Sequence, residues 1–121
     1  MEIVKLEYTD VFDDNQIKEL VFSKHLIESD FNERSLFALM VDGSSMEPLI
    51  NHKAVIVTDL SQKELQDKAI YILYHSEKMW VKSYNKKSDA FISINPQFSH
   101  LVYEKEDIHL IARVVLTFTN L

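Results

Sequence analysis

The chain has 121 residues, of which 46% are hydrophobic, and a formal net charge of −6. That is enough material for one globular domain with its own core, and the absence of cysteine excludes disulfides. No basic segment followed by an apolar run opens the chain, and no apolar run approaches the roughly 18 residues that span a bilayer. We therefore expect a soluble cytoplasmic protein that does not enter a membrane.

The negative charge is concentrated near the N-terminus. Residues 1–35 carry nine acids against four bases, whereas residues 36–121 carry ten acids against nine bases. A surface that binds nucleic acid needs clustered Lys and Arg, but the one basic cluster here is small and consists of Lys82, Lys86 and Lys87. We expect no direct contact with DNA. We divide the chain into an acidic N-terminal segment, residues 1–35, that leads into a single domain at residues 36–121.

In chain order, the first predicted element is a helix over residues 14–22, where Ile17, Leu20 and Val21 have helical spacing. Residues 61–66 are compatible with one or two further helical turns. Residues 75–78 predict a hairpin turn and residues 85–89 a polar loop. Six segments rich in Val, Ile, Phe and Tyr predict strands: 36–41, 54–59, 69–75, 79–84, 91–94 and 108–118. The predicted fold is mostly β, with several short antiparallel strands and one or two short helices.

The segment at residues 40–50, MVDGSSMEPLI, contains the single glycine of the chain. Gly43 permits a backbone conformation that other residues resist, and Pro48 fixes φ in the turn that follows. Such a sharp exit from a strand either is a plain loop or presents Ser44 or Ser45 at its corner. If a helical turn follows, the free N–H groups of Ser45 and Met46 would point outward, as an oxyanion site requires.

A serine hydroxyl needs a base within hydrogen-bond reach to become a nucleophile. The five histidines are scattered, and their spacing predicts neither a triad nor a metal site. Lys82 lies in the predicted strand at 79–84, where alternation places it on one face with Trp80 and Tyr84. Burial there would lower its pKa and leave a neutral amine. A lysine in a strand is more often an exposed surface residue, so Lys82 alone is weak evidence for a site. The serine turn and the strand lysine together favour a Ser-Lys site.

These residues carry a family resemblance. VDGSSMEPLI resembles V-x-G-D-S-M-x-P, the nucleophile motif of the LexA and phage-repressor class of self-cleaving peptidases, with Ser45 in the nucleophile position. AVIVTD resembles the strand that follows, and AIYILYHSEKMWVKSYN resembles the hairpin that bears the family's lysine, here Lys82. The segment at residues 92–115 resembles S-x-N-P-x-Y followed by the closing strand I-x-G-R-V-V. The resemblance covers residues 36–117.

The resemblance implies a compact LexA-like peptidase fold in which Lys82 takes the proton of Ser45 and the amides of Ser45 and Met46 hold the oxyanion. It implies no cofactor and no metal. Members usually follow a helix-turn-helix domain that binds operator DNA, and an activated recombinase filament promotes their self-cleavage in the SOS response. DNA would be reached only through such a domain, which this chain lacks. The resemblance also implies a homodimer through the closing strand, at Ile108, Leu110, Val114 and Leu116.

Several departures from the family pattern bear on function. Ser44 stands where the motif has aspartate, residues 51–55 replace a glycine-aspartate turn, and Ala112 replaces the glycine of the closing strand. Family members cut an Ala-Gly or Cys-Gly bond, yet residues 6–15, the corresponding region, contain neither alanine nor glycine. Self-cleavage at the customary bond is therefore not expected within this chain.

Three explanations follow from the missing bond. The cleavage bond lies before Met1 in a longer protein, a different bond is cut, or the domain is a catalytically idle dimerisation and sensing module. A stand-alone protein similar to UmuD is a further alternative, and so is a signal-peptidase-like enzyme, although the missing membrane anchor argues against the latter. We favour the C-terminal regulatory domain of a repressor, because NPQF and the closing strand look more like phage-type repressors.

Overall fold

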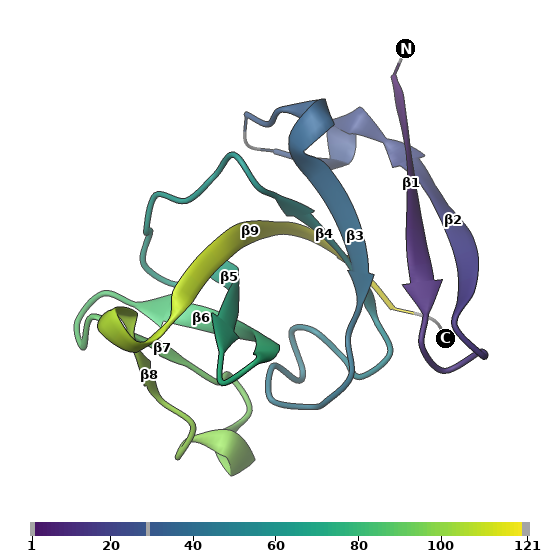
Figure 1. Ribbon diagram of the computed structural model, residues 1–121. Coiled ribbons are helices and arrows are strands. Elements are labelled where there is room, and N and C mark those ends of the chain that lie inside the picture. Colours follow the sequence, from purple (N-terminus) through teal and green to yellow (C-terminus); the bar gives the residue numbers. More distant parts are fainter. Residues whose placement is uncertain (1, 29, 120–121) are drawn as a thin grey trace.

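The computed structural model describes residues 2–28 and 30–119, which form two antiparallel sheets (Figure 1). The first is the hairpin β1–β2, and the second has seven strands in the order β3-β4-β9-β5-β6-β7-β8. The strands are β1 Ile3–Asp10, β2 Gln16–Ser23, β3 Leu36–Met40, β4 Val55–Asp59, β5 Ile70–His75, β6 Lys78–Asn85, β7 Ala90–Ile92, β8 Tyr103–Glu104 and β9 His109–Phe118. The predicted mostly β fold is confirmed.

Helical structure in the described residues is limited to single 3-10 turns. They are η1 Lys24–Leu26, η2 Glu33–Ser35, η3 Pro96–Phe98 and η4 Lys105–Asp107. Within residues 2–28 and 30–119, no helix has the length and apolar character needed to cross a bilayer.

The six strands predicted from the sequence correspond to β3, β4, β5, β6, β7 and β9, with ends that differ by one or two residues. The predicted hairpin turn lies between β5 and β6, where Ser76 and Glu77 have φ values of 52° and 65°. Two positive φ values match the twist of the flanking strands, as in a type I′ turn. The predicted polar loop at residues 85–89 connects β6 to β7, and Asn85 accepts a hydrogen bond there from the Ser88 N–H.

The predicted helix at residues 14–22 is wrong, because residues 16–23 form strand β2. Every residue of β2 pairs with a residue of β1, from Gln16 opposite Asp10 to Ser23 opposite Ile3. The apolar side chains therefore divide with period two. Phe22 is buried, whereas Ile17 and Val21 are 64% and 49% exposed. Pairing with a strand that the sequence analysis had not predicted outweighed a weak helical pattern.

The helical turns expected at residues 61–66 are also absent, since this segment is irregular. Its first residues instead surround the fully buried carboxylate of Asp59 at the end of β4. Ser61 donates to Asp59 through its N–H at 2.8 Å and through its hydroxyl at 2.6 Å. The side chain of Gln62 donates to the same carboxylate at 3.2 Å. These hydrogen bonds satisfy the buried charge of Asp59, and they fix the conformation of the segment that follows β4.

The seven-stranded sheet is strongly curved, and β9 arcs across it in Figure 1. Irregularities in strand register occur at Val57/Thr58, opposite β9, and at Ile72/Leu73, again opposite β9. Such irregularities bend a sheet locally. The hairpin β1–β2 lies beside β3 (Figure 1) and contributes Val4 and Phe22 to a core cluster that includes Leu36 and Val57. The N-terminal residues thus share a core with the large sheet.

Candidate active site

Backbone hydrogen bonds and the conformation of Gly43 hold the turn after β3 in place. The N–H of Val41 donates to the carbonyl of Ala54 at 2.8 Å, which extends the pairing of β3 with β4. Gly43 has a φ of 131°, a conformation that residues with a Cβ rarely adopt, and its N–H donates to His52 Nδ1 at 2.9 Å. The corner that follows leaves Ser44 and Ser45 half-buried.

The residues after the corner anchor the turn in the core. The Met46 side chain is 2% exposed and packs with Ile50 and Ile56. The Ile50 N–H donates to the Met46 carbonyl at 2.9 Å, so the expected helical turn is a single turn and not a helix. In the described part of the chain, the N–H groups of Ser45 and Met46 donate no hydrogen bond. They are free to bind an oxygen of a ligand.

Lys82 lies in the middle of β6 and its side chain is fully buried. Its Nζ is 2.8 Å from Ser45 Oγ and 3.0 Å from Ser93 Oγ. Ser45 and Lys82 are 37 positions apart in the sequence, and the pairing of the sheet brings them into contact. The structure thus joins the two residues that the sequence analysis singled out.

Burial lowers the pKa of Lys82 from its ordinary value to about 8. No carboxylate within the described residues forms an ion pair with this amine, so no opposite charge counteracts the effect of burial on the pKa. Its Nζ lies 5.6 Å from the centre of the Trp80 ring, as the shared strand face predicts, and 5.9 Å from that of Tyr103. Tyr103, and not the predicted Tyr84, is the second aromatic neighbour, because Tyr84 packs against Phe91.

Two residues that contact the pair have no role predicted from the sequence. Ser93 accepts from Lys82, and Asn95 joins the nucleophile turn through two hydrogen bonds of 2.9 Å. The Asn95 side chain donates to the Ser44 carbonyl, and its N–H donates to the Ser45 carbonyl. Both residues belong to the S-x-N-P pattern. The spacing of Ser93 and Asn95 within this pattern does not predict a contact with a turn about 50 positions earlier in the sequence.

The four residues proposed for dimerisation are half-buried on or beside β9. Ile108 and Leu110 pack against one core cluster, Val114 against a second and Leu116 against a third. Residues 109–113 pair with β5, whereas residues 113–118 pair with β4. In the described chain, the backbone edge of residues 114–118 that faces away from β4 therefore pairs with no strand.

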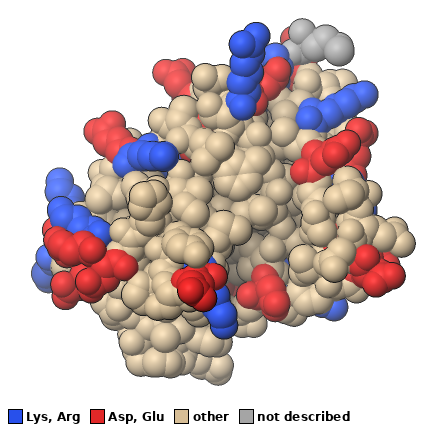
Figure 2. Space-filling model, in the orientation of Figure 1, with Lys and Arg blue, Asp and Glu red and all other residues tan. Residues whose placement is uncertain are grey.

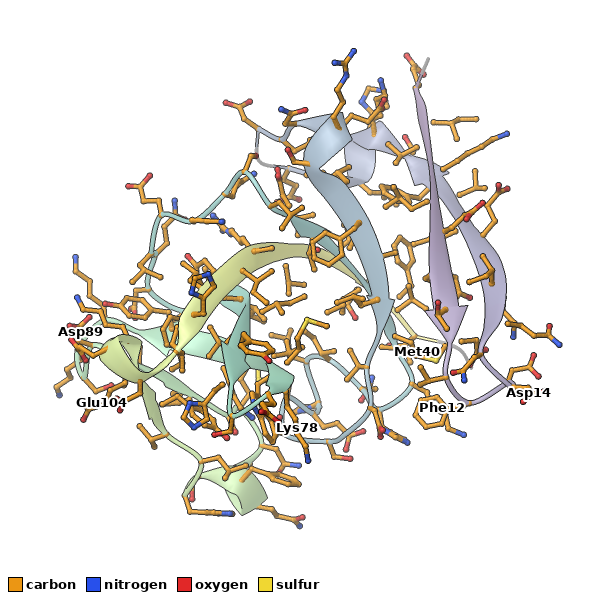
Figure 3. The ribbon with its side chains drawn as sticks, in the orientation of Figure 1. Phe12, Asp14, Met40, Lys78, Asp89 and Glu104 are labelled. Atoms are coloured by element: carbon orange, nitrogen blue, oxygen red, sulfur yellow. The ribbon has the colours of Figure 1, made fainter. Side chains whose placement is uncertain are left out.

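A cleft of about 500 Å³ opens at Ser45 between the hairpin and the large sheet. Residues 7–9 and Val11 form part of its wall, so part of the segment at residues 6–15 lies along the cleft. Phe12 lies at the hairpin tip (Figure 3). Its ring packs edge-on against His52 at 5.1 Å between ring centroids. The tip therefore contacts the same histidine that accepts from Gly43.

Within the described ranges, no three His, Cys, Asp or Glu side chains gather as ligands of a metal ion would. At Ser45 the polar groups are hydroxyls, backbone amides and the buried amine of Lys82. The charged residues that line the cleft are Glu7 and Asp42. A β domain that buries a lysine amine against a serine at a strand exit has the makeup of a serine-lysine peptidase domain.

Comparison with known proteins gives the family. The Peptidase S24-like family model matches residues 4–115, and the chain belongs to this family. An "Uncharacterized HTH-type transcriptional regulator" of Haemophilus influenzae strain Rd is 34% identical over 80 residues. The matched region covers 61% of this chain and 34% of that protein, so the chain matches about a third of the relative's length.

Proposed function

We propose that this chain is the regulatory domain of a LexA-type transcriptional repressor, and that Ser45 and Lys82 form its catalytic dyad. The observation that carries the proposal is the 2.8 Å contact between Ser45 Oγ and a buried amine whose pKa is lowered to about 8. Membership of the S24-like family supports the peptidase part. The relative described as a transcriptional regulator supports the regulatory part.

The first step is acylation of Ser45. The lone pair of the neutral Lys82 amine accepts the hydroxyl proton while Oγ bonds to the carbonyl carbon of a peptide bond. The resulting oxyanion accepts hydrogen bonds from the N–H groups of Ser45 and Met46. When the C–N bond breaks, the Lys82 ammonium returns its proton to the leaving amine, and an ester remains on Ser45.

The second step is hydrolysis of that ester. Water attacks the ester carbonyl while Lys82 accepts one of its protons, and the ester oxygen then leaves as the Ser45 hydroxyl, to which Lys82 returns the proton. The lowered pKa matters in both steps. With a pKa of about 8, roughly one lysine in ten is neutral at pH 7, against roughly one in three thousand at the ordinary value.

The substrate of a repressor domain of this kind is a peptide bond of its own protein, cut when an activated recombinase filament forms in the SOS response. Residues 6–15 contain no alanine or glycine, so the bond differs from the customary one or lies in another segment. The same absence supports the second candidate function, a catalytically idle module for dimerisation and sensing. DNA binding would come from a helix-turn-helix domain elsewhere.

Homodimerisation through β9 is the third part of the proposal. The unpaired edge of residues 114–118 is the surface that supports it, because an exposed strand edge pairs readily with another strand. Thr117 has an exposed side chain on this stretch, whereas Val114 and Leu116 pack in the core. Analytical ultracentrifugation of the wild type and of Thr117→Lys tests the interface, provided that equal melting temperatures show the variant to be folded. We expect a weaker dimer for Thr117→Lys. An unchanged dimer would argue against β9 as the interface.

The dyad is tested by intact mass after treatment with a fluorophosphonate, which forms a stable adduct with activated serines. We expect one adduct on the wild type, no adduct on Ser45→Ala, and one adduct on Ser44→Ala, the matched control one position away. Lys82→Ala should block the reaction as well. Wild-type protein that forms no adduct from pH 6 to 10 would overturn the dyad and leave the idle dimerisation module as the better account.

A further inference from the structure

His52 lies outside the nucleophile turn, residues 42–46, but is hydrogen-bonded to it. Its Nδ1 accepts from the N–H of Gly43 at 2.9 Å. Its own N–H donates to the Glu47 carboxylate at 3.2 Å, and the next N–H along the chain donates to the carbonyl of Val41 at 2.8 Å. The histidine ring is therefore carried by a backbone that is itself fixed against the turn.

The hydrogen bond from Gly43 defines the protonation state of the ring. A backbone N–H only donates, so Nδ1 of His52 must be unprotonated, and the neutral ring carries its proton on Nε2. When the ring gains a second proton, both of its nitrogens become donors. The new Nδ1–H would then face the N–H of Gly43, and the hydrogen bond between them would be lost.

Asp42 offers a partner to the protonated ring. Figure 2 shows acidic side chains along the lower border of the hollow on this face, and Asp42 is one of the acids that line the cleft. Its Oδ1 lies 3.9 Å from Nδ1 of His52, which is too far for a hydrogen bond but close enough to attract a charged ring. His52 thus has one partner for each protonation state, Gly43 when neutral and Asp42 when charged.

The charged groups around the ring come from three segments. They are Asp42 and Glu47 of the nucleophile segment, Lys53 next to the histidine, and Asp13 and Asp14 at the hairpin tip whose Phe12 packs on the ring. Among the described residues, Asp42 is the one carboxylate within 4.0 Å of a ring nitrogen of His52. The charged ring therefore has a single nearest partner.

The contact with His52 differs in kind from the other contacts that hold the turn. Asn95 donates to two carbonyls of the turn, one of them that of Ser45, and neither hydrogen bond involves a titratable group. In the described chain, His52 is the one titratable side chain that hydrogen-bonds to the backbone of the turn. Gly43 lies shortly before Ser45 and has a φ of 131°. Loss of its hydrogen bond would let the strand exit move, and a small displacement of a catalytic group lowers the rate steeply.

We propose that His52 is a positioning residue, which holds the nucleophile turn while its ring is neutral and releases the turn when its ring is protonated. The charge of a histidine ordinarily changes between about pH 5 and 8. The placement of Ser45 would then depend on pH through a residue outside the dyad. The inference rests on the proposed function for the reactivity of Ser45, whereas the contact between His52 and Gly43 can be tested without it.

The single glycine of the chain makes that contact directly observable. Protein labelled with nitrogen-15 glycine gives one backbone amide signal, that of Gly43. We expect this signal to shift between pH 7 and 5 in the wild type and to stay in place in His52→Asn, whose side-chain oxygen can accept the hydrogen bond but gains no proton. Lys82, with a pKa of about 8, is largely protonated throughout this range. A wild-type signal that stays in place, or an equal shift in His52→Asn, would overturn the inference.

Acylation of Ser45 by a fluorophosphonate measures the effect on the nucleophile. Wild type and His52→Asn share the titration of Lys82, which therefore cancels in the ratio of their rates. We expect the ratio of wild type to His52→Asn to be near one at pH 8 and to fall to roughly one tenth at pH 5. His52→Leu, which has no acceptor, should be roughly tenfold slower than the wild type at pH 8. A ratio that stays constant with pH would overturn the role in positioning.

Two further variants assign the effect to the ring and to its charged partner. His25→Asn is the matched control, because His25 is 74% exposed and lies beyond the end of β2 that is remote from the hairpin tip. It should behave as the wild type in both experiments. Asp42→Asn removes the partner of the charged ring and should move the Gly43 transition to lower pH. A transition that stays in place would contradict the role of Asp42.

The two experiments separate the possible failures. Wild-type protein that forms no adduct at any pH would contradict the dyad, and the Gly43 signal would still decide the role of His52. An adduct on Ser45 together with a constant rate ratio would leave the dyad intact and contradict the inference.

Discussion

Two strand lysines in this chain have opposite electrostatic environments. Lys18, in the N-terminal hairpin, forms ion pairs with Asp10 at 2.7 Å and with Asp13 at 2.9 Å, and the hydrogen bonds that it donates to these carboxylates raise its pKa. Lys82, in the large sheet, is fully buried beside two hydroxyls, and burial lowers its pKa to about 8. The comparison shows two opposite effects on the pKa of a strand lysine. Carboxylate partners raise it, whereas burial without a carboxylate partner lowers it.

The two lysines also differ in what surrounds them. The Lys18 side chain is 38% exposed, and solvent screens its charges. The amine of Lys82 instead meets hydroxyls from two other segments, at Ser45 and Ser93. A hydroxyl satisfies an N–H donor and carries no charge that would hold the lysine protonated. The environment of Lys82 therefore supports the proposed proton transfer, whereas the hairpin lysine belongs to a local ion-pair network.

The largest expected effect separates the lysines by reactivity. Lys82→Met should lower the rate of Ser45 acylation by a fluorophosphonate at pH 8 by about 10²–10⁴-fold, the usual contribution of a general base. Lys18→Met should leave that rate within about twofold, because the hairpin ion pairs do not contact the reacting atoms. Rates come from intact mass measured against time. Comparable losses in the two variants would contradict the distinction.

The second prediction concerns stability. The lysine has its ordinary pKa of 10.5 in the unfolded chain and about 8 in the folded chain. Between these pH values the unfolded state binds more protons, so the wild type gains stability as pH rises through this window. Lys82→Met lacks this titration. Its stability relative to wild type should fall by roughly 2–3 kcal/mol from pH 7 to 10.5.

Urea unfolding of both proteins at several pH values measures that difference. Lys87→Met is the matched control, since its exposed side chain should give a difference from wild type that stays constant with pH. A constant difference for Lys82→Met as well would mean that Lys82 titrates alike in the folded and unfolded chain.

The third prediction tests Ser93 as a positioning residue. Ser93→Ala removes the second acceptor of Lys82 and should slow acylation by roughly tenfold, since misplaced catalytic groups lose reactivity steeply. A hydroxyl acceptor favours the charged amine, so its removal should also move the midpoint of the pH profile lower. Ser93→Thr should restore both. Ser83→Ala, a buried serine on β6, is the control that should change neither.

The strands of the large sheet were predictable because their Val, Ile, Phe and Tyr content is strong and local. Contact between Ser45 and Lys82 was expected from the turn sequence, the strand position of the lysine and the family resemblance together. By contrast, the sequence predicts a helix where β2 lies, because Ile17, Leu20 and Val21 fit a helical spacing while the pairing with β1 is not visible in a short window.

The supporting residues were beyond prediction for a different reason. Asn95 reaches the carbonyls of Ser44 and Ser45 only after the chain has crossed the sheet and passed through β7. Nothing in the local sequence around Asn95 specifies that contact. The same holds for Tyr103, whose place beside Lys82 depends on the path of β8.

The smallest expected effect lies at the hairpin tip. Phe12→Ala removes the edge-on contact with His52 and the position of Lys53 Nζ over the ring, 5.0 Å from its centre. It should lower the free energy of unfolding by about 1 kcal/mol or less. The acylation rate should stay within about twofold, because Gly43 keeps its hydrogen bond to His52. A large rate loss would show that the tip controls the nucleophile turn.

The titration of Lys82 itself is the most direct test of the central claim. Protein containing lysine labelled with carbon-13 at Cε would be followed by NMR from pH 6 to 11, with Lys82→Met used to assign the signal. The account predicts a midpoint near 8 for Lys82 and a midpoint above the ordinary lysine value for Lys18. A Lys82 midpoint near 10.5 would contradict the account, because the amine would then be protonated at neutral pH and unable to accept the proton of Ser45.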